Sequence, residues 1–182
     1  MPEQNQIALA PQKAEEDVWK YPRPPALQRT PNRLRVVWTS TQGEETIIAD
    51  TTEGYRVLET SHPPTYYLPP SSIKVPIQKT SRQTYCEWKG KASYHTIRLS
   101  PNSASIENRI WSYPQPTATF SPIKDHFSFY ASTGTNERNA GGKWRCYVDE
   151  EEVGVQEGDF YGGWITSNIK GKMKGGPGTW GW

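Results

Sequence analysis

The chain has few cysteines and no long apolar segment. Of its 182 residues, 2 are cysteines, and Cys86 and Cys146 lie too far apart to suggest the disulfide framework of a small secreted protein. We therefore expect both thiols to be reduced. No stretch approaches the roughly 20 apolar residues of a membrane helix, and the first residues lack the basic start and apolar run of a signal peptide. These absences predict a cytoplasmic protein with no membrane partner.

The chain also lacks an excess of charge of one sign. Lys and Arg total 21 against 19 acidic residues, and the formal net charge of +2 is spread along the sequence. Such a balance gives no strong field for a polyanion. We expect no nucleic-acid partner.

Metal ligands are scarce and poorly spaced. There is no CxxC pair, so the sequence does not predict a structural zinc site. The three histidines, His62, His95 and His126, could supply a site only if the fold gathers them. Metal-dependent nucleotide transfer commonly uses closely spaced aspartates, and no Asp-x-Asp is present. The acidic run at 149–152 is typical of a solvated face, and we predict neither a metal nor a cofactor.

Aromatic residues, by contrast, are abundant. The chain contains 8 Trp, 10 Tyr and 4 Phe, although only 34% of its residues are hydrophobic. Each ring covers far more area than an aliphatic side chain. The length suffices for one domain with a real core. We expect an aromatic core or an aromatic pocket.

Short β-like runs separated by Gly, Pro, Ser, Asn and Asp are typical of antiparallel strands. The predicted strands cover residues 34–40, 45–50, 55–59, 65–68, 73–79, 93–99, 104–111, 144–148 and 151–155. Residues 123–130 follow a proline at roughly helical spacing and predict a short helix or turn. The polar, Gly-rich residues 133–143 predict a mobile surface loop. The fold class is therefore mainly β: a compact single domain of antiparallel strands with at most one or two short helices.

The composition divides the chain into three parts. Residues 1–32 form a polar tip and then a proline-rich arm, because prolines exclude a continuing helix and favour extended backbone. Residues 33–156 form the β domain. Residues 157–182 are too glycine-rich for stable secondary structure of their own but carry aromatic anchors, so we expect a tail that wraps the body.

Five ordered motifs carry a family resemblance: ETSHPPTYYLP at 59–69, CEWKGKASYHTI at 86–97, IWSYPQP at 110–116, FSFY at 127–130 and YVDEEEV at 147–153. Together they resemble DUF427, a nucleotidyltransferase-like domain family of unknown function. The arm and the GGPGT-containing tail resemble its longer members. The resemblance implies an all-β fold similar to the Mss4 group, which includes zinc-binding chaperone-like proteins and B-type methionine sulfoxide reductases. Fold alone transfers no activity.

The motifs supply the residues of a predicted small-ligand pocket. An acid, an ammonium, phenols and a thiol could together bind a polar or anionic ligand. In this hypothesis Lys89 neutralises an anionic group, Glu59 fixes polar orientation, and Trp111 is a stacking wall. The predicted ligand-binding residues are Glu59, Tyr66, Cys86, Lys89, Tyr94, Trp111 and Tyr130, with Tyr94 and Tyr130 as hydrogen-bond donors.

Several alternatives stay open at this point. The same residues could form a merely structural network, since a buried Lys–Glu pair perturbs its own pKa without doing chemistry. Cys86 could be a nucleophile if Lys89 lowers its pKa, or an inert buried thiol. A different class of function is a non-enzymatic interaction or oligomerisation module, with a homodimer as its natural form, in which arm and tail dock onto another chain. Nucleotidyl transfer is a third hypothesis, and the sequence leaves open whether any reaction is catalysed.

Overall fold

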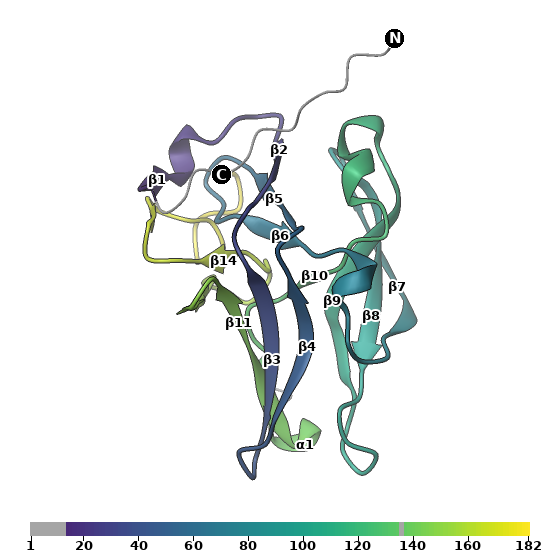
Figure 1. Ribbon diagram of the computed structural model, residues 1–182. Helices are drawn as coiled ribbons and strands as arrows, with labels where there is room; N and C mark the ends of the chain where they lie inside the picture. Colours follow the sequence, from purple (N-terminus) through teal and green to yellow (C-terminus); the bar gives the residue numbers. More distant parts are fainter. Residues whose placement is uncertain (1–13, 135–136) are drawn as a thin grey trace.

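Two four-stranded antiparallel sheets stand face to face in the computed structural model, which describes residues 14–134 and 137–182 (Figure 1). The first sheet has the order β12-β11-β3-β4 and the second has the order β10-β9-β8-β7. The strands of the first are β3 (Leu34–Ser40), β4 (Glu45–Thr51), β11 (Gly142–Val148) and β12 (Glu151–Glu152). Those of the second are β7 (Gln78–Cys86), β8 (Gly90–Ile97), β9 (Ile106–Pro116) and β10 (Ser128–Phe129).

Smaller sheets cover one end of this sandwich (Figure 1). One has the order β2-β5-β6, formed by β2 (Ala26–Arg29), β5 (Tyr55–Leu58) and β6 (Thr65–Tyr67). Two others are short pairs: β1 (Glu16–Asp17) runs parallel to β15 (Ile169–Lys170), and β13 (Gly154–Val155) runs antiparallel to β14 (Trp164–Ile165).

Helical segments are few and short. They are the 3-10 turns η1 (Val18–Lys20), η2 (Pro70–Ser72) and η3 (Ala118–Ile123), and the single turn α1 (Glu137–Ala140). No helix in the described part of the chain is long and apolar enough to cross a membrane. The predicted fold class, a compact and mainly β domain of antiparallel sheets, is confirmed.

Alternation along the strands directs side chains into the space between the sheets. Along β11, Trp144, Cys146 and Val148 are buried and their neighbours are half-buried. Successive side chains of a strand point to opposite faces, so one face of β11 supplies the core. The register with β3 sets Trp144 opposite Trp38.

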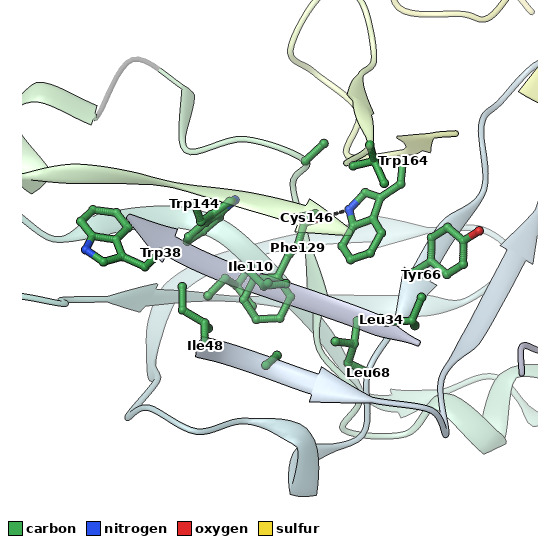
Figure 2. Packing of buried hydrophobic residues seen from close by; sticks show 14 of the residues in the cluster. Leu34, Trp38, Ile48, Tyr66, Leu68, Ile110, Phe129, Trp144, Cys146 and Trp164 are labelled. Atoms are coloured by element: carbon green, nitrogen blue, oxygen red, sulfur yellow. Dashed lines mark hydrogen bonds between the residues drawn. The ribbon is translucent and has the colours of Figure 1, made fainter. Parts of the chain in front are cut away.

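The main core fills the space between the two sheets. Figure 2 shows the ring of Phe129 in the middle of this cluster, near Trp144 and Ile110. The rings of Phe129 and Trp144 meet edge to face with centroids 5.7 Å apart, which is a favoured arrangement of aromatic pairs. Trp164, from the C-terminal segment, is buried in the same cluster, and its Nε1 donates to the Phe129 carbonyl at 2.8 Å. The tail is therefore part of the core.

The arm and the tail also meet each other. Val18 and Tyr21 from the arm pack with Leu58 and with Ile169 from the tail. Within the residues predicted as arm, β2 pairs with β5 as a regular sheet strand. The division at residues 32 and 156 stays a prediction, and residues 1–13 of the predicted tip lie outside the described residues.

Some sequence-based assignments differ from the structure. The strand predicted at 73–79 instead lies at β7, whose polar residues are mostly exposed because it is a sheet edge, so it shows no apolar alternation. The helix or turn predicted over 123–130 holds for residues 123–126, where the His126 amide donates to the Ile123 carbonyl at 3.0 Å, and is wrong for Ser128 and Phe129, which pair with β9. In the predicted loop 133–143, residues 137–140 form α1, and residues 135–136 lie outside the described part.

Two neighbouring isoleucines test how much the inter-sheet core stabilises the fold. Ile48 is fully buried and adjacent Ile47 is 46% exposed on the opposite face of β4. Ile48→Ala should lower the free energy of unfolding by about 2–4 kcal/mol, since it removes buried methyl groups and leaves a cavity. Ile47→Ala should change it by less than about 1 kcal/mol. Urea unfolding measures both, and equal effects would contradict this account of the core.

Candidate functional site

A cavity of about 690 Å³ lies beside the second sheet. Its wall comes from several parts of the chain: the β7–β8 hairpin, β9, the segment between β5 and β6 together with β6 itself, Tyr130 after β10, and the C-terminal tail. A volume of this size is in the usual range for small-molecule sites.

The β7–β8 turn brings Lys89 into the wall. Gly90 ends this turn at φ +106°, a conformation that L side chains rarely adopt, and a Cβ there would lie 3.2 Å from the Gln115 carbonyl oxygen. Thr117 fixes the turn from β9's end: its amide donates to the Lys89 carbonyl at 3.0 Å and its hydroxyl to the Trp88 carbonyl at 2.7 Å. The side chain of Lys89 is thereby held inside.

Lys89 is a buried cation without an acidic partner. The residue is 8% exposed, and no Asp or Glu of the described residues forms an ion pair with it. Its Nζ lies 5.9 Å from the ring centroid of Tyr113 and 6.0 Å from that of Phe120. Burial alone would lower the pKa of Lys89, but Tyr67, Cys86 and Glu59 outweigh it and raise the pKa above its usual value. The ammonium is therefore charged at neutral pH.

Tyr67, Trp111 and Tyr113 line the same cavity as this ammonium. Trp111 Nε1 donates to the hydroxyl of the fully buried Tyr67 at 3.4 Å. Burial raises the pKa of Tyr67 and of Tyr113, so both phenols stay protonated at neutral pH. The cavity wall thus contains the indole of Trp111, the phenols of Tyr67 and Tyr113, and the positive charge of Lys89.

Glu59 has a partner that sequence reasoning did not find. Its Oε1 lies 3.6 Å from Nζ of Lys174 in the tail, and both side chains are largely buried. The Lys174 ammonium also lies 4.9 Å from the ring centroid of Tyr161. Glu59 is therefore paired with the tail, and the Glu59–Lys89 pair considered from the sequence does not form. No local pattern in the sequence connects residue 174 with residue 59.

The tail makes a second set of polar contacts with the cavity wall. Asp159 accepts two hydrogen bonds from Arg109, at 3.0 and 2.9 Å, and the Arg109 guanidinium lies 4.0 Å from the ring centroid of Tyr130. The hydroxyl of Tyr130 donates to the Phe160 carbonyl at 2.9 Å. At Gly162 a Cβ would lie 2.5 Å from the ring of Trp111. The tail can reach this wall only because residue 162 has no side chain.

Six of the seven predicted ligand-binding residues line the cavity, and Tyr66 does not. Successive residues of β6 point to opposite faces. Tyr67 therefore faces the cavity, whereas Tyr66 lies in the main core with its ring centroid 5.2 Å from that of Trp164. The six lining residues are Glu59, Cys86, Lys89, Tyr94, Trp111 and Tyr130.

His62 lies in the same wall in its neutral form. Its Nδ1 is 2.7 Å from the Pro63 carbonyl, which can only accept, so Nδ1 carries the proton and Nε2 the lone pair. The ring meets Tyr161 edge to face at 5.1 Å. Burial is the main reason that the pKa of His62 is lowered to about 4. His62 adds an uncharged acceptor to the site.

The two thiols lie in different clusters. Cys86 is half-buried beside the aromatic residues of the cavity, and Cys146 is buried between the two sheets. Burial raises the pKa of Cys146 well above its usual value. Cys146 is therefore not placed to resolve an oxidised Cys86. In the described part of the chain no three His, Cys, Asp or Glu side chains are grouped so that they could hold a metal ion.

The thiols should differ in reactivity with Ellman's reagent. We expect Cys86 to react in the native protein, because it lines an open cavity. Cys146 should react only after unfolding, because it is buried and its pKa is raised. Cys86→Ser should remove the native reaction, and Cys146→Ser should leave it intact. Rapid native labelling of both thiols would contradict the placement of Cys146.

His62 should make stability depend on pH. Its folded pKa of about 4 lies below the ordinary 6.5, so between these values the unfolded chain binds more protons and stability is lost as the pH falls. In His62→Asn an amide can still donate to Pro63, and this dependence should disappear. From pH 6.5 to 4 we expect wild type to lose about 2–3 kcal/mol more than the variant, by urea unfolding. Parallel curves would show that His62 is not buried in its neutral form.

Comparison with known proteins agrees with the motifs. The profile of the domain of unknown function DUF427 matches residues 26–140, well over half of the chain. The matched region spans β2 to α1 and includes most of the cavity wall, but not Lys174 or the rest of the tail. Among curated proteins no match is found. The chain belongs to the DUF427 family.

Proposed function

We propose that the cavity binds a small polar or anionic ligand through Lys89. The observation that supports this is Lys89 itself, a residue that is 8% exposed and whose ammonium forms no ion pair among the described residues. Burying a charge costs free energy unless a counter-charge compensates it. An anion in the cavity would supply that counter-charge. The Tyr67 hydroxyl, which accepts from the indole of Trp111, would still have its own O–H to donate to the same anion.

The other acidic and basic groups of the wall support this role for Lys89. Lys174 forms an ion pair with Glu59, and Arg109 forms one with Asp159. These two pairs hold the tail on the wall, so they shape the cavity and leave its charge unchanged. Arg82, Glu87 and Glu107 also line the cavity, but all three are exposed to solvent. Lys89 is the buried cation of the wall that a ligand could still neutralise.

The second candidate function is the non-enzymatic interaction module. Its premise is that arm and tail dock onto another chain. Here Trp164, Gly162 and Lys174 of the tail pack against the body, which favours a structural role for most of the tail. Trp180 (82% exposed) and Phe160 (61% exposed) are the tail aromatics that could still meet a partner. We keep a homodimer or other protein partner as the second proposal.

Lys89→Met tests the proposed function, with Lys91→Met as its control. Lys91 is exposed on the same hairpin, so both variants lose one positive charge. Wild type and Lys91→Met, incubated with a mixture of small carboxylates, phosphates and sulfates, should retain an anion in native mass spectrometry. Lys89→Met should bind it at least about tenfold more weakly, because a hydrogen bond to a charged group is lost.

The variant should still fold, since a methionine fills much of the space of the lysine stem without a buried charge. Circular dichroism and the melting temperature check this. Wild-type retention of the anion by Lys89→Met would contradict the proposal. An anion-free dimer in all three proteins would favour the interaction module instead.

A further inference from the structure

We infer that the anion bound in this cavity carries a planar aromatic ring, as an aromatic monocarboxylate does; the inference rests on the proposed function of Lys89. The observation that carries it is the composition of the wall. None of its lining residues in the described chain is Ala, Val, Ile, Leu or Met. The apolar surface comes from aromatic rings, among them Trp88, Tyr94, Trp111, Tyr113, Tyr130 and Tyr161.

This composition is not a consequence of a shortage of aliphatic residues. The chain places its aliphatic side chains between the two sheets, where Leu34, Ile48 and Ile97 are fully or almost fully buried. The cavity wall is built differently. Several of its rings, including Trp88, Tyr94 and Tyr130, stay only partly buried and leave aromatic surface toward the cavity. A flexible alkyl chain would gain no aliphatic contacts there.

Aromatic rings prefer other rings in offset or edge-to-face contact. The wall already contains one such pair, Trp111 and Tyr130, with ring centroids 5.3 Å apart and planes at 74°. Such a pair presents rigid surfaces at fixed angles. A planar ligand can complement them without ordering additional side chains.

Sugars also stack on aromatic residues, but they need free polar groups for their hydroxyls. Here several polar groups near the rings are used within the protein. Glu59 pairs with Lys174, Asp159 with Arg109, and the hydroxyl of Tyr94 bonds to Thr84 at 3.0 Å. These pairings leave open the ring surfaces and the Lys89 ammonium, while the remaining charged groups of the wall, Arg82, Glu87 and Glu107, lie exposed to solvent.

The sign and size of the ligand charge follow from the cations. Lys89 opposes a cationic ligand, although aromatic walls often bind cations. Arg109 is paired with Asp159, Lys174 with Glu59, and Arg82 lies exposed to solvent, which screens its charge. Lys89 is therefore the one buried positive charge of the wall without an ion pair among the described residues. One charge matches a carboxylate better than a doubly charged phosphate. The geometry therefore favours a monoanion.

Isothermal titration calorimetry with 2-naphthoate and its saturated analogue decahydro-2-naphthoate tests the ring. Both probes carry the same carboxylate and a similar carbon skeleton. Wild type should bind 2-naphthoate about threefold to tenfold more tightly, the range expected for one or two aromatic contacts. The neutral 2-naphthamide should bind at least about tenfold more weakly than 2-naphthoate, because it cannot neutralise Lys89.

Trp111→Leu should lower the ratio of the two affinities toward one, because it removes ring surface on which only the aromatic probe can stack. Trp111 is buried, so Tyr94→Leu, a change at a half-buried ring, provides the same test if Trp111→Leu does not fold. Lys91→Met should behave as wild type with both probes.

The outcomes separate the two proposals. Equal affinity for the two probes in wild type, no saturable binding of 2-naphthoate at millimolar concentration, or tighter binding of glucuronate than of 2-naphthoate would overturn the aromatic ring. A preference unchanged in both ring variants would overturn it as well. If Lys89→Met still loses anion binding in any of these cases, the proposed function stands. Binding of carboxylates by Lys89→Met as tightly as by wild type would overturn the proposed function itself.

Discussion

The packing of two twisted sheets through their inner faces is the constraint on which the rest of the structure depends. Trp144 from β11 and Phe129 from β10 meet in this layer. Because the inner face of each strand is committed to the core, the outer face of β8 and β9 is free to carry Trp111 and Tyr113. The cavity lies on that second face. A change in the register of β9 by one residue would exchange the two sets of side chains.

The C-terminal tail joins the core to the cavity. Trp164 is buried in the main core, Gly162 lies close to Trp111, and farther along the tail Ile169 packs against the arm and Lys174 pairs with Glu59. The tail is therefore anchored both by hydrophobic packing and by an ion pair. Since the family match ends at residue 140, the tail contributes wall residues from outside the matched region. The site of this chain is accordingly more than its family domain alone.

The predictable parts of the structure are those with a strong local signal. The strand at 34–40 coincides with β3, and the one at 45–50 lies within β4, because β-branched and aromatic residues end there at clear turn residues. β7 was misplaced because a polar edge strand resembles a loop. The strand at 128–129 was missed because pairing with β9 overrides a local spacing that resembles a helix. The similarity to the Mss4 group stays a prediction.

The candidate site also has features that the sequence predicts and features that depend on the tertiary structure. By itself the sequence determined the aromatic content, the family motifs and the residue types Glu, Lys, Cys and Tyr, since composition and short motifs are local properties. Only the tertiary structure decided that Tyr67 rather than Tyr66 faces the cavity, and that Lys174 rather than Lys89 pairs with Glu59. Strand orientation depends on partners elsewhere in the chain, and the ion pair joins residues far apart in sequence. The lone charge of Lys89 follows from that choice of partner, and no local pattern encodes it.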